Sequence, residues 1–316
     1  MHGTRYRRRL LAVLIVLAGG CGREAPATDA PLTVFAAGSL ARPLRAALDS
    51  VVASGGPPAT LEIMGSREML RAVTSLHRIP DLVVTADADE MERTLLPSHI
   101  TASTTFARNR VVLALSRRLA GGDTVTTRNW AAVMASGALR VARTDPARAP
   151  LGYRTQLVWI LTEAARHEAG LAQRLAAASP AALVRGNESD LAALLESGDA
   201  DAAWCYESLA RALGLRYVTL GSDIDLGSTA PADVAGYAQA RVRVPGAAPG
   251  DSIEMTGTPI RYGIAVLTGG IDPVRAAVLR ERLLDADSRR IMRRAGLDVL
   301  DSVHVTRARD SLHGAP

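Results

Sequence analysis

The sequence contains few of the side chains that enzymes and metalloproteins commonly use for chemistry. It has no Lys among 316 residues, two Cys, six scattered His and only 3% aromatic residues. No H-x-x-x-H pair and no Cys–His neighbours occur, so the spacing of a zinc site is absent. The glycine patterns of nucleotide-binding loops, the G-x-S-x-G turn and S-x-x-K are also missing. These absences argue against most common catalytic classes.

Long apolar runs are absent as well, and the one apolar stretch of note lies at the N-terminus. A basic segment, Arg5–Arg9, precedes the apolar run Leu10–Ala18. This pattern predicts a signal peptide at residues 1–20, too short to span a membrane. Leu17–Cys21 resembles a bacterial lipobox, although Ala18 replaces the usual Leu. Lipidation of Cys21 would anchor the exported chain to a membrane through a tether at residues 21–31; ordinary signal cleavage is the alternative.

Short apolar strands alternate with helical patterns after residue 31, which predicts an α/β fold. Strands are expected at Leu32–Ala37, Leu61–Met64 and Leu82–Thr85, and a long helix at Gly152–Ala177. Long strands at Phe106–Leu115 and Ile260–Val266 would let the chain cross between two lobes. The first lobe would comprise residues 32–108 and 260–316, and the second residues 109–259. A small ligand would bind in the cleft between them.

A strand–Gly–Ser–helix junction occurs twice, at Gly38–Ser39 and at Gly65–Ser66. Glycine permits a tight turn, and a serine at a helix start places a hydroxyl beside free N–H groups. Such a junction can bind an oxyanion without a cationic side chain. Taken alone, each serine is better explained as a plain helix N-cap, but the repetition of the junction favours a binding site.

The second lobe offers similar features. Ala149, Pro150 and Leu151 precede or begin a long helix, whose first N–H groups would be free to donate. Alternatively, Pro146, Pro150 and Gly152 only shape a turn there. Glu188 begins another helix, where it could also simply favour the helix dipole. Tyr206 lies between a strand and a helix, and its hydroxyl could contact a ligand or cap the sheet edge.

These motifs resemble the periplasmic molybdate/tungstate-binding proteins of ABC transporters, in particular the tungstate-binding, archaeal-type branch. The resemblance covers nearly the whole mature chain. It is carried by the following segments, in this order: Phe35–Leu40, Gly65–Ser66, Ala86–Asp87, Phe106–Asn109, Asp145–Pro146, Pro150–Arg154, Glu188, Asp190–Leu191, Leu195–Gly198, Tyr206 with Ser208, and Ile260–Ile264.

The resemblance implies a two-lobed periplasmic-binding-protein fold of type II that closes on its ligand by hinge motion. It also implies ligand contacts at Gly38, Ser39, Ser66, Ala149, Pro150, Leu151, Glu188 and Tyr206. In the tungstate branch an Asp and a Glu bind the metal centre directly; here Glu188 matches the Glu, but Ala149 stands at the Asp position. Glu188 would then ligate the metal with a water completing the coordination, or donate a hydrogen bond in its protonated form. Arg148 either compensates charge or faces solvent.

The expected function is therefore high-affinity capture of tungstate or molybdate by a monomeric lipoprotein that delivers it to an ABC transporter permease. No cofactor and no catalytic residue are expected. The net charge of +5 belongs partly to the N-terminus, and no basic stripe is interleaved with aromatics, so nucleic-acid binding is not indicated. Binding of another oxyanion, such as sulfate or phosphate, is the first alternative. A hydrolase with Ser39 or Ser66 as nucleophile is a remote one.

Overall fold

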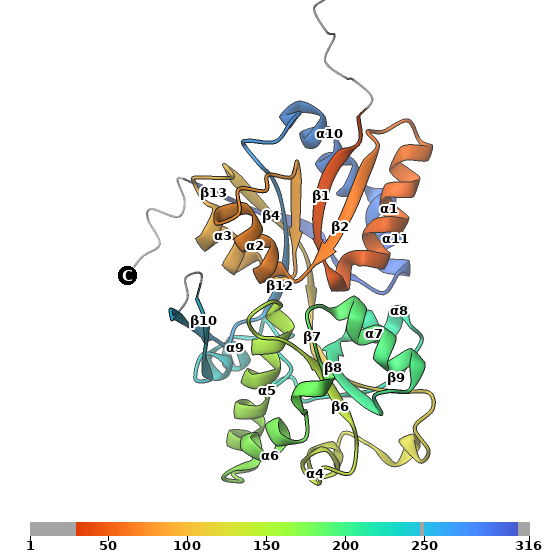
Figure 1. Cartoon of the computed structure of the whole chain (residues 1–316), viewed down its shortest axis with the longest axis vertical. Helices are drawn as coiled ribbons and strands as arrows, with labels where there is room; N and C mark the ends of the chain where they lie inside the picture. The colour runs from red at the N-terminus through yellow and green to blue at the C-terminus, as the bar shows by residue number, and fades with distance from the viewer. Residues whose placement is uncertain (1–29, 247–249, 309–316) are drawn as a thin grey trace, which may run out of the picture. The chain divides into compact units, whose positions relative to one another are not determined.

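The computed structural model describes residues 30–246 and 250–308. The predicted signal peptide, the lipidation site Cys21 and nearly all of the tether lie outside the described residues. From Pro31 onward the chain forms one compact unit. This unit contains two larger sheets flanked by helices, the α/β architecture expected from the sequence (Figure 1).

The first lobe is built on a six-stranded sheet with the order β13-β4-β12-β3-β1-β2. Strand β1 pairs in parallel with β2 and β3, whereas β12 runs antiparallel to β3 and β4. Because β1 lies between β3 and β2 rather than at an edge, it is almost entirely buried. The elements of this lobe are β1 (Leu32–Ala37), η1 (Gly38–Leu40), α1 (Ala41–Ala53), β2 (Ala59–Met64), α2 (Ser66–Thr74), β3 (Leu82–Thr85), α3 (Ala88–Leu95), β4 (Ala102–Asn109), β12 (Ile260–Val266), α10 (Pro273–Leu283), α11 (Ala286–Arg294) and β13 (Asp298–Arg307).

The second lobe is built on a five-stranded sheet with the order β7-β6-β8-β5-β9. Its core includes all three tryptophans: the Trp204 ring packs edge-on against Trp130 and Trp159, with centroids 5.5 and 6.0 Å apart. The elements are β5 (Val111–Leu115), η2 (Gly122–Thr124), α4 (Trp130–Ala135), β6 (Val141–Thr144), α5 (Pro150–Arg166), α6 (Leu171–Ala177), η3 (Ala181–Leu183), β7 (Val184–Arg185), α7 (Glu188–Ser197), β8 (Ala202–Tyr206), α8 (Glu207–Ala212) and β9 (Arg216–Thr219).

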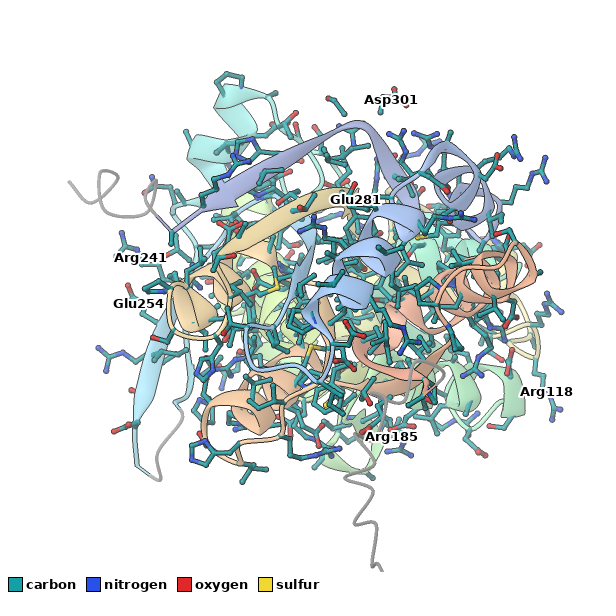
Figure 2. The ribbon with its side chains drawn as sticks, turned by 90° about the horizontal axis from the view of Figure 1, so that it is seen from above. Arg118, Arg185, Arg241, Glu254, Glu281 and Asp301 are labelled. Carbon is teal, nitrogen blue, oxygen red and sulfur yellow. The ribbon has the colours of Figure 1, made fainter. Side chains whose placement is uncertain are left out.

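A separate hairpin follows helix α9 (Pro231–Tyr237). Its strands β10 (Arg241–Pro245) and β11 (Ser252–Thr256) pair antiparallel. Arg241 and Glu254 form an ion pair of 3.0 Å across it, and Figure 2 shows both side chains at the left edge of the view. The hairpin also reaches the first lobe, because Arg67 donates to the Pro245 carbonyl at 2.9 Å.

Some of the strands and helices predicted from the sequence are confirmed, and the predicted bounds of others are wrong. Strands β1 and β3 have the predicted bounds. The single strand expected at Phe106–Leu115 is two strands in different sheets, separated at Arg110, so the chain changes sheets there. The helix expected at Gly152–Ala177 is also two, because His167 and Gly170 adopt left-handed conformations with φ of 53° and 78°. The exact lobe boundaries at 108–109 and 259–260 stay a prediction.

None of the helices in the described ranges is long and apolar enough to cross a membrane.

Candidate functional site

The two Gly–Ser junctions lie at the same edge of the first sheet. Strand β1 ends immediately before Gly38, and β2 ends immediately before Gly65. Since β1 and β2 are adjacent and parallel, their carboxyl ends meet at one edge. Ser39 and Ser66 are both buried, with exposed fractions of 4% and 1%. The structure therefore brings these two predicted site residues to one end of the first lobe.

Both junction glycines are required by close contact with the second lobe. A Cβ atom on Gly38 would lie 2.8 Å from the backbone nitrogen of Glu188 and 2.8 Å from its Oε2. A Cβ atom on Gly65 would lie 2.1 Å from the Arg148 carbonyl oxygen. These distances are too short for any side chain. The glycines thus let the two lobes approach each other at the predicted site.

Glu188 is the most unusual side chain in this region. It begins helix α7, is 1% exposed, and neither carboxylate oxygen has a hydrogen-bond partner within the described chain. Burial raises the pKa of Glu188 to about 7, although the backbone amides of Glu188 and Ser39 and the charge of Arg154 act in the opposite direction. A buried carboxyl group without partners is costly and calls for a proton or a ligand.

The N-terminus of helix α5 offers a backbone donor from the second lobe. Ala149 is its N-cap and Pro150 its first residue, and both are buried. The N–H of Leu151, the second residue, has no carbonyl within α5 to bond. Arg148 is half exposed, and its guanidinium makes a two-armed contact with Glu68, with Nη2 2.9 and 2.8 Å from the carboxylate oxygens. Its charge is therefore already paired across the lobes.

The direction of the Ser39 hydroxyl follows from a chain of hydrogen bonds. The Asn109 carbonyl oxygen accepts from the Arg110 amide at 3.0 Å, which leaves its NH₂ group to donate to the Tyr262 oxygen at 2.9 Å. Tyr262 in turn donates to Ser39 Oγ at 3.0 Å. Because Ser39 Oγ accepts this bond, its own hydrogen remains available to a ligand.

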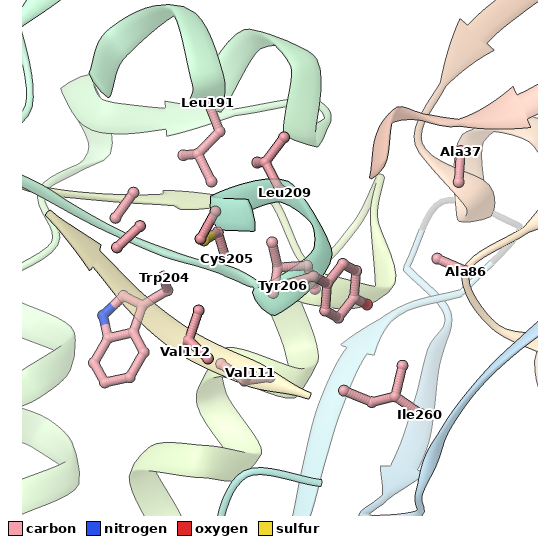
Figure 3. Close-up of a cluster of buried hydrophobic side chains, with 14 of the residues drawn as sticks. Ala37, Ala86, Val111, Val112, Leu191, Trp204, Cys205, Tyr206, Leu209 and Ile260 are labelled. Carbon is pink, nitrogen blue, oxygen red and sulfur yellow. The ribbon is translucent and has the colours of Figure 1, made fainter. Parts of the chain in front are cut away.

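Ser66 and Tyr206 have the same arrangement. The Ala86 amide donates to Ser66 Oγ at 3.0 Å, and Arg154 Nη1 donates to the Tyr206 oxygen at 2.7 Å. Neither donor can accept, so both hydroxyl hydrogens must point elsewhere. Figure 3 shows the Tyr206 ring extending from the end of β8 toward Ala86 and Ala37 of the first lobe. The three hydroxyls therefore form a set of hydrogen donors.

Comparison with known proteins identifies the family. The family model described as bacterial extracellular solute-binding protein matches residues 32–298. The chain belongs to this family. A putative ABC transporter molybdenum-binding protein of Haloferax volcanii is 32% identical over 275 residues, which are 82% of each chain. A molybdate/tungstate-binding protein of Thermococcus kodakarensis is 26% identical over 327 residues, covering 92% of this chain and 91% of the relative.

The fold comparison agrees. The periplasmic molybdate-binding protein of Azotobacter vinelandii superposes with a TM-score of 0.60 and 15% identity, over 86% of this chain and all of that one. The expected two-lobed, type II fold and the resemblance to molybdate/tungstate-binding proteins are thereby confirmed. As an extracellular solute-binding protein, the chain acts outside the cytoplasm.

Sequence reasoning assigned no role to the buried Arg154 of this solute-binding protein. Its guanidinium is 2% exposed and contacts Ala86, Asp87 and Tyr206. One signal was available: Arg154 is the only charged residue in the otherwise neutral run Pro150–Thr162 at the start of a buried helix. A lone cation in such a run is seldom free of a specific partner.

The hydrolase alternative finds no support in the contacts of either serine. The side-chain partners of Ser39 and Ser66 are the Tyr262 hydroxyl and the Ala86 amide, and neither is a base. His77 follows helix α2 and is exposed. In the described ranges no cluster of three His, Cys, Asp or Glu residues could hold a metal ion. The hydroxyl hydrogens of Ser39, Ser66 and Tyr206 are instead free to reach an acceptor.

Proposed function

We propose that this chain is an exported, lipid-anchored protein that captures tungstate or molybdate and delivers it to an ABC transporter permease. The names of its relatives support this ligand, and the hydroxyl directions support a fully deprotonated oxyanion. Ser39, Ser66 and Tyr206 all offer hydrogens, so a ligand that itself carries a proton would meet few acceptors among them, and only an ionised Glu188 would accept that proton. Gly38 and Leu151 would add backbone N–H donors, while Ala149 and Pro150 would line the site without donating, because the Ala149 amide already bonds the Asp145 carbonyl and proline has no N–H.

The observation that carries the proposal is Glu188, whose buried oxygens lack partners. A carboxylate beside a dianion is unfavourable unless it is protonated or binds the metal centre. Molybdenum and tungsten can accept an additional oxygen ligand, whereas the sulfur of sulfate cannot. Glu188 therefore favours molybdate and tungstate over sulfate if it ligates, and any fully deprotonated oxyanion if it is protonated.

Isothermal titration of the mature chain from Gly22 onward with tungstate, molybdate and sulfate tests the ligand. We expect submicromolar affinity for tungstate or molybdate and no heat with sulfate. Tight sulfate binding with weak molybdate binding would replace this function with the sulfate alternative.

X-ray absorption of the tungstate complex would then decide the role of Glu188. A regular tetrahedron around tungsten would exclude direct ligation by Glu188. The same titrations on Glu188→Gln would measure its contribution to affinity. Glu196→Gln, on the exposed side of α7, is the matched control.

The anchor has a separate test. Cys21→Ser should move the mature protein from the membrane fraction to the soluble fraction, because it removes the acceptor of the lipid. Processing and membrane association that survive this change would favour ordinary signal cleavage.

A further inference from the structure

Arg154 and Tyr153 of the second lobe are held by a single carboxylate of the first lobe. Asp87 directly follows the turn after β3, and its Oδ1 caps helix α3 by accepting from the Glu90 amide at 3.0 Å. Its Oδ2 accepts from the Tyr153 hydroxyl and lies 3.3 Å from Arg154 Nη2. This contact joins the lobes at a point where Asp87 and Arg154 are both almost fully buried.

The same guanidinium has two further contacts through one nitrogen. Arg154 Nη1 donates to the Ala86 carbonyl at 2.6 Å and to the Tyr206 oxygen at 2.7 Å. Ala86 belongs to the first lobe, and Tyr206 to the second. The position of the Arg154 side chain when it bonds Tyr206 is therefore fixed by partners in the opposite lobe.

The Tyr206 hydroxyl stays protonated beside Arg154. Burial raises the pKa of Tyr206 well above its ordinary value, so the phenol is neutral. A guanidinium has no acceptor, so the Tyr206 oxygen must accept from it and direct its own hydrogen elsewhere. Without Arg154 the hydroxyl could rotate and accept a hydrogen bond instead.

We propose that Arg154 is a positioning residue that couples closure of the lobes to the direction of the Tyr206 hydroxyl. As the lobes close, Ala86 and Asp87 fix the guanidinium, which then holds the Tyr206 hydrogen toward the bound oxyanion. Arg154 thereby excludes anions that need an acceptor, such as hydrogen arsenate, without touching the ligand. This inference rests on the proposed function for its ligand, but not for its effect on lobe closure.

The test uses a double-mutant cycle on the mature chain, with Arg154→Met, Tyr206→Phe and the combination. Molybdate and tungstate affinities should fall roughly 10- to 100-fold in Arg154→Met, the range expected for a lost hydrogen bond to a charged group. The loss should be several-fold smaller when Phe already replaces Tyr206. The preference for molybdate over arsenate, measured at mildly acidic pH where arsenate and Glu188 both keep a proton, should also fall in Arg154→Met.

Two further variants separate positioning from folding. Arg154→Lys keeps the buried charge but cannot reach all three partners, so it should lose discrimination against arsenate while it stays folded by circular dichroism. Arg140→Met removes an exposed arginine of the second lobe that is paired with Asp201. It should leave both the oxyanion affinity and the discrimination against arsenate unchanged. An equal loss in both Tyr206 backgrounds, with unchanged arsenate discrimination, would show that Arg154 is only structural.

Failure of the proposed ligand is distinguishable from failure of this inference. If the unmodified chain binds none of these anions, the proposed function is wrong. Small-angle X-ray scattering of the ligand-free proteins then decides the role of Arg154 in closure. We expect a larger radius of gyration for Arg154→Met and Asp87→Asn than for the unmodified chain. Identical radii would overturn the coupling.

Discussion

Replacement of Glu188 by Gln should stabilise the ligand-free protein at neutral and alkaline pH. The carboxyl group is buried without a hydrogen-bond partner, and its pKa is raised from 4.5 to about 7. Between these values the folded protein holds a proton that the unfolded chain has released. Stability contributed by this group is therefore complete below pH 4.5 and declines as the pH rises toward 7. Across this pH range the free energy of unfolding falls by roughly 3 kcal/mol because of this one group.

Gln has nearly the same shape as Glu but does not ionise. The free energy of unfolding of Glu188→Gln should consequently exceed that of the unmodified protein by up to about 3 kcal/mol near pH 8, and the gap should shrink near pH 5. Urea unfolding followed by tryptophan fluorescence suits this measurement. All three tryptophans are buried in the second lobe, which also carries Glu188.

Glu196→Gln provides the control, because Glu196 lies on the same helix but is exposed, and its 3.4 Å ion pair with the exposed Arg42 contributes little to stability. It should leave the pH dependence of unfolding unchanged. If Glu188→Gln shows the same pH dependence as the unmodified protein, to within about 1 kcal/mol, the carboxyl group is solvated in the ligand-free state. The reasoning from its burial would then be refuted.

Three other outcomes follow from the site and the core. Gly38→Ala should weaken oxyanion binding by roughly 10- to 100-fold in titration calorimetry, because its Cβ would lie 2.8 Å from Glu188 and hinder closure. Ala149→Asp should add an oxygen neighbour to bound tungstate in X-ray absorption spectra; an unchanged spectrum would contradict a position beside the metal. In the mature chain, Cys205 should resist thiol reagents near pH 8 until urea is added, since burial raises its pKa to about 12.

Local sequence signals predicted the first strands of the fold and the turns that follow them. Strands β1 and β3 are short apolar runs, and the Gly–Ser turns after β1 and β2 mark helix starts. Prediction failed where tertiary contacts decide the structure. Strand β13 contains many polar residues and is recognisable only by its pairing with β4. The break between α5 and α6 depends on the left-handed conformation of His167, and histidine is not a usual sequence signal for the end of a helix.

The candidate site shows a similar division. Gly38, Ser39, Ser66, Glu188 and Tyr206 could be selected because each lies at the junction of a strand or loop with a helix. The residues that orient them come from other segments. Asn109 and Tyr262 reach Ser39 from β4 and β12, and no local pattern connects these positions. Hydrogen-bond direction is a property of the assembled network and cannot be read from spacing along the chain.

The order of strands in the first sheet has a consequence for how the chain acquires its structure during synthesis and export. Strand β12 pairs with both β3 and β4, so that Ile264 lies beside Val84 and Thr104. All five strands of the second sheet, by contrast, lie between Val111 and Thr219. The inserted lobe can therefore complete its sheet while the first lobe still lacks an interior strand. Until β12 emerges, the exposed edges of β3 and β4 are the surfaces most open to aggregation or to protection by a chaperone.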